Sequence, residues 1–378
     1  MDQLNCRVCG SSFYNQRLIY DDMPRAAQNF PDDRSVVSEK GERLTIRQCS
    51  GCGLIQSTSA LVSYYRDVIR AAAFSPAMAA FRLKQFSELD SEYGFSAKRT
   101  IELGSGRGEY LQLMQNAGWD VWGLEHMDSS VSAALESGFR VQKGYVGTGD
   151  YELEEGPFEA FVTFNYLEHI PNIDSFLAGI SNNLVSGGIG LIEVPNFDMM
   201  YAESMSTEFI ADHLYYFTET TLRRTLEING FDVMNIGVTW HGYIISAVVK
   251  KRQEISFNNF LAQDAQLRKE LISFLQTHRN ERVAVWGAGH QALATIAMTK
   301  IADQLAYVID SAPFKQNKFT PATHIPIVAP EILESDPVET ILVMAAAYSD
   351  EVVKQIKSKY QKKFHIAVLR ESGLDVLN

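Results

Sequence analysis

The chain has 378 residues, of which 46% are hydrophobic and 21% are charged, the balance of an ordinary globular protein. Its formal net charge of −12 argues against nucleic acid as a partner, because phosphate backbones are bound by clustered lysine and arginine side chains. The sequence shows neither an apolar run of the ~18 residues that span a bilayer nor the pattern of a secretory signal. We therefore expect a cytoplasmic protein without membrane contact.

The first segment of the chain is rich in turns and carries all four cysteines, in two C-x2-C pairs. Cys6 and Cys9 form one pair, Cys49 and Cys52 form the other, and 39 residues separate the pairs. A glycine follows each pair, and a tight turn lets both thiolates of a pair reach one tetrahedral ion. Two disulfides or four free thiols are the alternatives, but disulfides are disfavoured in the cytoplasm. The spacing predicts structural Zn²⁺ in an N-terminal zinc-binding domain over residues 1–70.

Short apolar runs then alternate with amphipathic stretches up to about residue 250. This alternation predicts a parallel sheet with helices on both faces, so we expect an α/β core over residues 71–252. Strands are expected at 98–103, 120–125, 139–143, 158–164 and 188–194, and helices at 109–118, 129–138 and 173–184. The runs at 231–238 and 243–250 favour an antiparallel pair at the end of this core.

The first strand of this core leads into a glycine-rich turn. The strand ends in Glu102, the chain turns through Gly104, Ser105 and Gly106, and a helix begins at Glu109. Glycine permits positive φ and lets a ligand lie against the backbone. The clustered carboxylates would repel a pyrophosphate, whereas a sulfonium with an amino-acid tail would tolerate or favour them. The turn therefore favours S-adenosylmethionine over a dinucleotide.

The next strand ends in Glu125, 21 residues after Gly104. An acid at this position accepts hydrogen bonds from ribose hydroxyls in dinucleotide folds. On this interpretation His126 and Met127 flank the adenine. The alternative is that Glu125 is merely an exposed acid at the end of a strand.

The fourth strand runs into the loop 165–171, at the edge of the sheet where ligands of open α/β sheets bind. We expect Asn165 and Leu167 to touch the methyl donor. His169 is a further candidate for this site, although Glu168 and His169 can equally be structural.

Asp212 and His213 follow the fifth strand and provide an adjacent acid and imidazole. An imidazole titrates near neutrality and can remove a proton from a carbon next to a carbonyl, so His213 is the candidate base and Asp212 its partner. Tyr215 and Tyr216 come next and could wall a sugar. The alternative is that Asp212 caps a turn and that His213 is a satisfied polar residue.

A polar stretch at 250–255 and a helix at 258–277 precede a second alternating series, which predicts a smaller, Rossmann-like α/β domain over residues 253–378. Residues 285–291 predict a strand, a glycine turn and a helix whose N-terminus can receive an anion. We expect His290 and Lys315 to bind the nucleotide or phosphate of an activated substrate. A Rossmann-like unit that serves packing alone is the alternative.

Taken in order, the paired cysteines, ELGSGRGEYL at 102–111 with Glu125, NYLEHI at 165–170, WGAG at 286–289 and THIPI at 323–327 resemble the tylosin-type sugar C-methyltransferase family over nearly the whole chain. The resemblance implies a zinc-binding domain, a class I methyltransferase core and a Rossmann-like C-terminal domain. It also implies methylation of a carbon of a nucleotide-linked keto-sugar through an enolate. The family carries a Tyr-His-Glu-His-type motif where this chain has Ile210, Ala211, Asp212 and His213, and often a tyrosine where it has Ile69.

The sequence thus predicts an S-adenosylmethionine-dependent methyltransferase that acts on an activated sugar. Two other functions stay open at this point. One is methylation of an oxygen or nitrogen of a related sugar, with His213 deprotonating a hydroxyl or an amine. The other is a non-catalytic module that binds the donor without turnover. The sugar and the methylated atom are not specified by the sequence, and a monomer is favoured.

Overall fold

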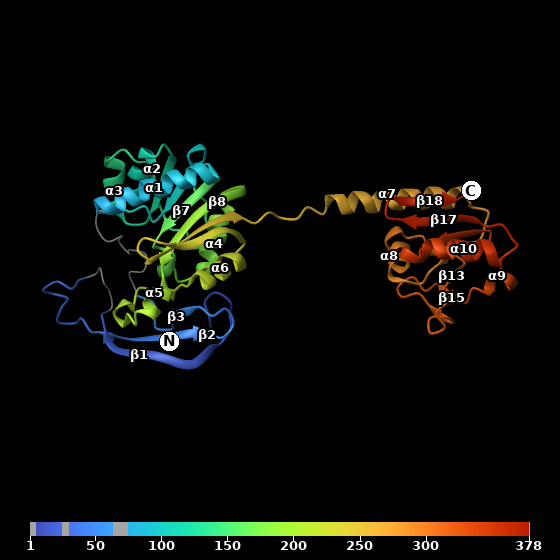
Figure 1. Ribbon diagram of the computed structural model, residues 1–378, viewed down its shortest axis with the longest axis horizontal. Helices are drawn as coiled ribbons and strands as arrows, with labels where there is room; N and C mark the ends of the chain where they lie inside the picture. Colours follow the sequence, from blue (N-terminus) through green and yellow to red (C-terminus); the bar gives the residue numbers. More distant parts are fainter. Residues whose placement is uncertain (1–4, 25–29, 63–74, 378) are drawn as a thin grey trace. The chain divides into compact units, whose positions relative to one another are not determined.

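The computed structural model describes residues 5–24, 30–62 and 75–377. The chain divides into two compact units, Met1–Gln253 and Glu254–Asn378 (Figure 1). Within the described ranges, none of the helices is long and apolar enough to cross a membrane. Ile69, where the family often has a tyrosine, lies outside the described residues.

The paired cysteines lie at one end of a four-stranded antiparallel sheet with the order β1-β2-β3-β9, and Cys49 is the last residue of its strand β2. Its strands are β1 (Phe13–Met23), β2 (Glu42–Cys49), β3 (Ile55–Ser57) and β9 (Tyr215–Tyr216). Ile55 pairs with Tyr216 and Gln56 pairs with Tyr215. The sheet is therefore completed by a strand from residues 215–216, well beyond residue 70. Main-chain hydrogen bonds between β3 and β9 thus join the cysteine-containing segment to the α/β core within the first unit.

The second sheet of this unit has the order β10-β11-β8-β7-β4-β5-β6. Its strands are β4 (Arg99–Leu103), β5 (Asp120–Glu125), β6 (Val141–Lys143), β7 (Phe158–Phe164), β8 (Leu184–Pro195), β10 (Phe231–Thr239) and β11 (Ile244–Lys251). The five strands from β8 to β6 are parallel, whereas β11 and β10 are antiparallel to their neighbours. The predicted α/β class and the antiparallel pair at its end are confirmed.

Helices cover both faces of this sheet, as Figure 1 shows. They are α1 (Pro76–Tyr93), α2 (Glu109–Asn116), α3 (Asp128–Glu136), α4 (Ile173–Asn182) and α6 (Glu219–Ile228). The short helix α5 (Phe197–Ala202) instead packs against the N-terminal sheet, where Phe197 and Met200 meet Leu44 and Ile46. Short 3-10 turns lie at Phe95–Ala97, Leu167–His169 and Ser206–Glu208. The carboxyl ends of the parallel strands meet at one edge, so the loops that follow β4, β5, β7 and β8 gather there.

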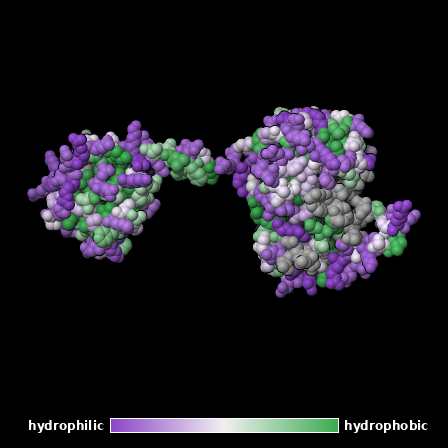
Figure 2. All heavy atoms as spheres, turned by 180° about the vertical axis from the view of Figure 1, so that it is seen from behind, coloured by the Kyte–Doolittle hydropathy of each residue, from purple (hydrophilic) through white to green (hydrophobic). Residues whose placement is uncertain are grey.

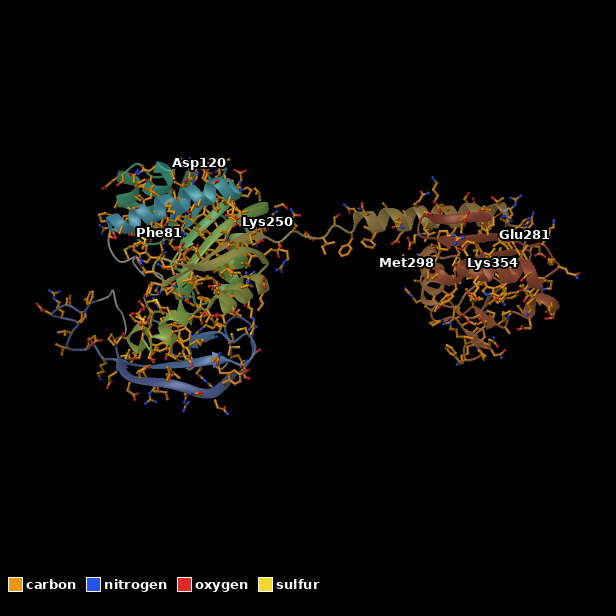
Figure 3. The ribbon with its side chains drawn as sticks, in the orientation of Figure 1. Phe81, Asp120, Lys250, Glu281, Met298 and Lys354 are labelled. Carbon is orange, nitrogen blue, oxygen red and sulfur yellow. The ribbon has the colours of Figure 1, made fainter. Side chains whose placement is uncertain are left out.

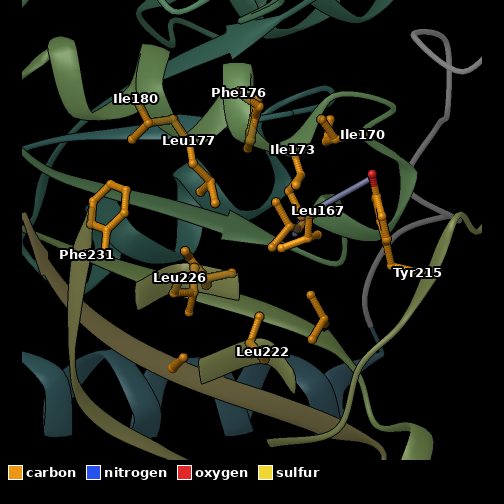
Figure 4. Close-up of a cluster of buried hydrophobic side chains, with 14 of the residues drawn as sticks. Leu167, Ile170, Ile173, Phe176, Leu177, Ile180, Tyr215, Leu222, Leu226 and Phe231 are labelled. Atoms are coloured by element: carbon orange, nitrogen blue, oxygen red, sulfur yellow. The ribbon is translucent and has the colours of Figure 1, made fainter. Parts of the chain in front are cut away.

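Each face of the sheet has its own apolar core. On one side α4 and α6 contribute Phe176, Leu177, Leu222 and Leu226 to a cluster that also contains Tyr215 (Figure 4). A second cluster contains residues of α1 and α2 with alternate residues of the same strands. Strands buried on both faces need apolar residues at nearly every position, which is why the sequence shows continuous apolar runs there.

The helix ends follow local sequence signals. Ser75 caps α1 by accepting a hydrogen bond from the Met78 amide at 3.2 Å, and Gly94 ends the helix with φ 65°. On α1, Phe81 (labelled in Figure 3) packs on Trp240 of the β10–β11 turn, with ring centroids 5.2 Å apart. The start of α1 is therefore fixed against the antiparallel end of the sheet.

The second unit contains a seven-stranded sheet with the order β14-β15-β13-β12-β16-β17-β18. Its strands are β12 (Val283–Trp286), β13 (Tyr307–Ile309), β14 (Lys318–Phe319), β15 (Pro326–Val328), β16 (Thr340–Val343), β17 (His365–Arg370) and β18 (Gly373–Leu377). Its helices are α7 (Asn258–Thr277), α8 (His290–Thr299), α9 (Ile332–Ser335) and α10 (Ser349–Lys359), with 3-10 turns at Ala302–Gln304 and Ala346–Tyr348. The five central strands are parallel, which confirms the predicted Rossmann-like character.

In Figure 2, hydrophobic side chains are interspersed with hydrophilic ones over the surface of both units, and α7 also exposes hydrophobic side chains. Its first turns expose Phe257, Phe260 and Leu261, and the ring centroids of the two phenylalanines lie 6.1 Å apart. The remainder of α7 buries Leu271, Phe274 and Leu275 in the core of the second unit.

Candidate active site and cysteine cluster

The four cysteines converge at the end of the N-terminal sheet. The Sγ atoms of Cys6 and Cys52 are 3.7 Å apart, those of Cys9 and Cys49 are 3.4 Å apart, and all four lie within 4.8 Å of one another. No disulfide joins them. A tetrahedral zinc site with Zn–S bonds of about 2.3 Å has S–S edges of about 3.8 Å. The cluster is therefore compatible with zinc.

The surroundings of the sulfurs also suit thiolates. The amides of Gly51 and Cys52 donate hydrogen bonds to Cys49 Sγ at 3.3 and 3.4 Å, and Gln56 Nε2 donates to Cys6 Sγ at 3.1 Å. A Cβ at residue 51 would lie 2.3 Å from Ser11 Oγ, so any other residue at this position would displace Ser11. Donors directed at sulfur stabilise its anionic form.

The predicted donor turn lies between β4 and α2, where the loops after the parallel strands gather. Gly104, Gly106 and Gly108 all have positive φ, and Glu102 and Ser105 are fully buried. The Glu109 carboxylate accepts a hydrogen bond from the Arg107 amide at 3.1 Å. The turn thus has the strand–turn–helix form that the sequence predicted.

Glu125 ends the neighbouring strand β5 and reaches this turn. One carboxylate oxygen accepts a hydrogen bond from the Gly106 amide at 2.8 Å, and the other accepts from the amides of His126 and Met127 at 2.9 Å each. The structure therefore brings together the turn, the predicted ribose ligand and the two residues expected at the adenine.

The loop after β7 covers the turn from the other side. The Tyr166 ring lies 3.1 Å from the point where a Cβ on Gly104 would stand. Sequence reasoning named the neighbours of Tyr166 but missed Tyr166 itself. Asn165 has φ 47°, a left-handed conformation that is uncommon outside glycine and that occurs preferentially at functional sites. Leu167 is fully buried in the apolar cluster of Figure 4, so contact with the donor stays a prediction for this residue.

Beside this loop, Glu168 and His169 meet Asp212 and His213 from the segment after α5. His169 Nδ1 lies 2.9 Å from the carbonyl oxygen of Asp212, and because a carbonyl only accepts, Nδ1 carries the proton. The rings of His169 and His213 have centroids 4.7 Å apart in an edge arrangement. A carboxylate oxygen of Glu168 and one ring nitrogen of each histidine lie within 4.8 Å of one another.

Burial sets the charge state of this cluster. It lowers the pKa of His169 to about 4, and together with the nearby His169 it lowers the pKa of His213 well below its usual value. Burial raises the pKa of Asp212, and burial with the neighbouring Asp212 raises the pKa of Glu168 to about 8. Both imidazoles are therefore neutral at pH 7, and burial makes each of them a weaker base than a free imidazole.

The expected contact between the Asp212 carboxyl and the His213 ring is not made. Asp212 Oδ1 is buried without a hydrogen-bond partner among the described residues, and it is the main-chain carbonyl of Asp212 that holds His169. Tyr215 and Tyr216, which were expected to line a sugar site, are both almost completely buried. Tyr215 donates its hydroxyl to Pro171 O at 3.2 Å and Tyr216 donates to Ile210 O at 3.2 Å. Their packing role is observed, and contact with a substrate stays a prediction.

A buried ion pair near the same edge was not anticipated from the sequence. Arg82 of α1 and Glu193 of β8 are fully buried with 2.5 Å between Nη1 and Oε2, and Gln85 donates to the other oxygen at 2.5 Å. Glu193 is aligned in the sheet with Phe164, the last residue of β7. A charged residue inside the apolar run at 188–194 was the available signal.

In the second unit, the glycine turn after β12 is held by Asp310. Its carboxylate accepts hydrogen bonds from the Ala288 amide at 2.8 Å and from Lys315 Nζ at 2.9 Å. The hydrogen bonds to Lys315 and to main-chain amides lower the pKa of Asp310, although burial opposes them. Lys315 therefore lies at the predicted turn but is ion-paired there, and His290 is exposed at the first position of α8.

Two families of proteins match separate parts of this chain. Residues 74–236 match the methyltransferase domain, and residues 248–368 match the C-methyltransferase C-terminal domain. The chain is an S-adenosylmethionine-dependent methyltransferase.

Individual relatives of the methyltransferase are distant. C-methyltransferase NovU from Streptomyces niveus is 21% identical over 389 residues, which cover 93% of this chain and 92% of NovU. An S-adenosylmethionine-dependent methyltransferase from Aquifex aeolicus is 16% identical, with a TM-score of 0.37, and the match covers 47% of this chain and 99% of that one. The glycopeptide N-methyltransferase MtfA, in complex with S-adenosylmethionine, is 14% identical, with a TM-score of 0.36 and coverage of 46% and 94%.

Proposed function

We propose that this methyltransferase transfers the methyl group of S-adenosylmethionine to a carbon of a nucleotide-linked keto-deoxysugar. The cluster of half-buried His213 with buried Asp212, His169 and Glu168, in the loop after β7 and the segment before β9, is the observation that carries this proposal. It supplies neutral bases for a carbon acid. The C-terminal domain match and the distant likeness to NovU support carbon as the methylated atom.

The donor supplies an electrophilic methyl group on its sulfonium. Glu102, Ser105 and Glu109 of the turn hold the amino-acid portion, Glu125 accepts hydrogen bonds from the ribose, and His126 and Met127 flank the adenine. On the far side of the donor, Asn165, Leu167 and His169 close the site. Glu125 already accepts three main-chain hydrogen bonds, and a carboxylate has about four acceptor sites, so it can accept one ribose hydroxyl while keeping all three.

His213 is the acceptor-activating base in this proposal. Its neutral ring removes the proton from the carbon beside the sugar carbonyl, and the C–H electron pair moves into the enolate. The enolate carbon then attacks the methyl group, the sulfur–carbon bond breaks, and the carbonyl reforms. A neutral His213 is the form that burial favours.

A phosphate-binding role is proposed within the second unit, and a structural ion is proposed for the cysteines. The amino end of α8, with His290 and Lys315, supports recognition of a phosphate, provided that Lys315 exchanges its bond to Asp310 for the anion. Cys6, Cys9, Cys49 and Cys52 hold Zn²⁺ at a closed site that takes no part in the reaction.

Deuterium exchange tests the proposed chemistry at the acceptor carbon. A nucleoside-diphosphate-linked keto-sugar that is deuterated beside its carbonyl is incubated with the enzyme, and release of deuterium to water is followed by mass spectrometry. His213→Asn should leave donor binding nearly intact, abolish the exchange and lower turnover by ~10²–10⁴-fold. Turnover without any exchange in the wild-type enzyme would instead favour methylation of oxygen or nitrogen.

A further inference from the structure

Glu168 belongs to the cluster described above, but the proposed mechanism gives its buried carboxyl group no step. It lies in the 3-10 turn Leu167–His169 directly after β7, and only 1% of its surface is exposed. Its Oε2 is buried and has no hydrogen-bond partner among the described residues. Leaving such an atom unpaired costs about 1–3 kcal/mol, so its partner in the folded protein is a water, an ion or a bound substrate.

The groups around Glu168 keep it uncharged. The titratable side chains that face it are His169, His213, Asp212 and Tyr243, and none of these is a cation at neutral pH. Burial and the nearby Asp212 raise its pKa to about 8. A protonated carboxyl carries one hydrogen-bond donor in addition to its acceptors.

The position of this donor suits an enolisable carbonyl. A Glu168 oxygen and a ring nitrogen of His213 lie within 4.8 Å of each other. A carbonyl oxygen and the carbon beside it are close enough to meet both groups at once, each at a hydrogen-bond distance of about 3 Å. Glu168 would thus face the atom on which negative charge develops while His213 faces the proton that leaves.

We propose that Glu168, in its protonated form, donates a hydrogen bond to the carbonyl oxygen of the acceptor and stabilises the enolate. The inference rests on the proposed carbon methylation. As His213 takes the proton from carbon, the electron pair of the C–H bond is delocalised onto the oxygen that Glu168 contacts. Glu168 keeps its proton through the step, and the hydrogen bond weakens again when the carbonyl reforms after methyl transfer. A preformed donor in a dry site stabilises developing charge strongly.

Two substitutions separate this role from packing. Glu168→Gln keeps the size and a donor, so it should retain most of kcat, and it should lose the decline in kcat that the wild type shows above about pH 8. Glu168→Leu keeps a side chain of similar size but cannot donate a hydrogen bond. Its kcat should therefore fall by ~10²-fold, while its affinity for S-adenosylmethionine should not change. Glu136→Gln, at the exposed end of α3, is the matched control and should keep the wild-type profile.

An infrared measurement reads the protonation state without turnover. The wild type with bound S-adenosylhomocysteine should show the C=O stretch of a protonated carboxyl group at pH 7, and this band should vanish in Glu168→Gln and fade above about pH 8. Absence of the band, or full activity of Glu168→Leu, overturns the proposal. Activity that requires an added divalent cation held by Glu168 overturns it as well. If the wild type released no deuterium but still showed the infrared band, carbon methylation would be contradicted and the protonation of Glu168 would not.

Discussion

The Glu125 carboxylate accepts hydrogen bonds from three main-chain amides at the donor turn. Its contribution to S-adenosylmethionine binding can be measured by removing it. Glu125→Ala removes the acceptor of Gly106, His126 and Met127 as well as the expected ribose contact. We expect S-adenosylmethionine to bind more weakly by about 1–3 kcal/mol, the scale for unpaired buried partners. Titration calorimetry checks this, with Glu136→Ala as the control. Unchanged affinity would refute the ribose assignment.

Because of buried His169, we expect the free energy of unfolding to fall as the pH is lowered. Its pKa is lowered to about 4 in the folded state by burial, against an ordinary value of about 6.5. Between these values the unfolded chain binds a proton that the folded chain does not, so acidification from pH 6.5 to pH 4 lowers the free energy of unfolding by up to about 3 kcal/mol. His169→Asn lacks this dependence. Urea unfolding of both proteins at pH 7 and pH 4 should show the difference, and parallel curves would contradict it.

The sequence predicts those site residues that are marked by a characteristic spacing along the chain. It does not predict residues whose role depends on being buried against distant segments. The cysteine pairs converge as their spacing indicated, and Glu125 reaches the glycine turn. The unpaired oxygen of Glu168 and the ion pair of Arg82 with Glu193 depend on segments far apart in the chain. Their partners cannot be read from local pattern.

The cysteine cluster, which we propose holds zinc, lies at the ends of strands and takes no part in the proposed reaction. Cys49 is the last residue of β2, and β3, which follows, carries β9 on its other edge. Cys49→Ser should abolish binding of about one zinc per chain and lower the melting temperature of the first unit, because ion binding contributes folding free energy. Metal analysis and calorimetry check this, with Ser38→Ala as control. Donor affinity should persist below the melting temperature, and a variant that keeps its metal and its stability would rule the site out.

The elements themselves were predictable to the extent that they are long and periodic. The helix expected at 258–277 is observed over those residues, and the antiparallel strands of the core are near their expected places. By contrast, β9 has two residues and no period, yet it completes the N-terminal sheet. A domain boundary at residue 70 was predicted from the order of residues along the chain, whereas the N-terminal sheet is defined by hydrogen bonds that include a strand at residues 215–216.

Over the whole molecule, the two units have separate apolar cores, and this separation predicts two unfolding transitions. Leu271 of α7 is fully buried in the core of the second unit. Leu271→Ala should destabilise that unit by about 2–5 kcal/mol through lost transfer energy and the cavity left behind. Removing zinc with a chelator should lower the other transition, since the cysteines belong to the first unit. Scanning calorimetry of the full chain distinguishes the two effects, with the exposed Leu135→Ala as the control for the substitution. If Leu271→Ala and the chelator lowered one and the same transition, the units would fold as a single cooperative body.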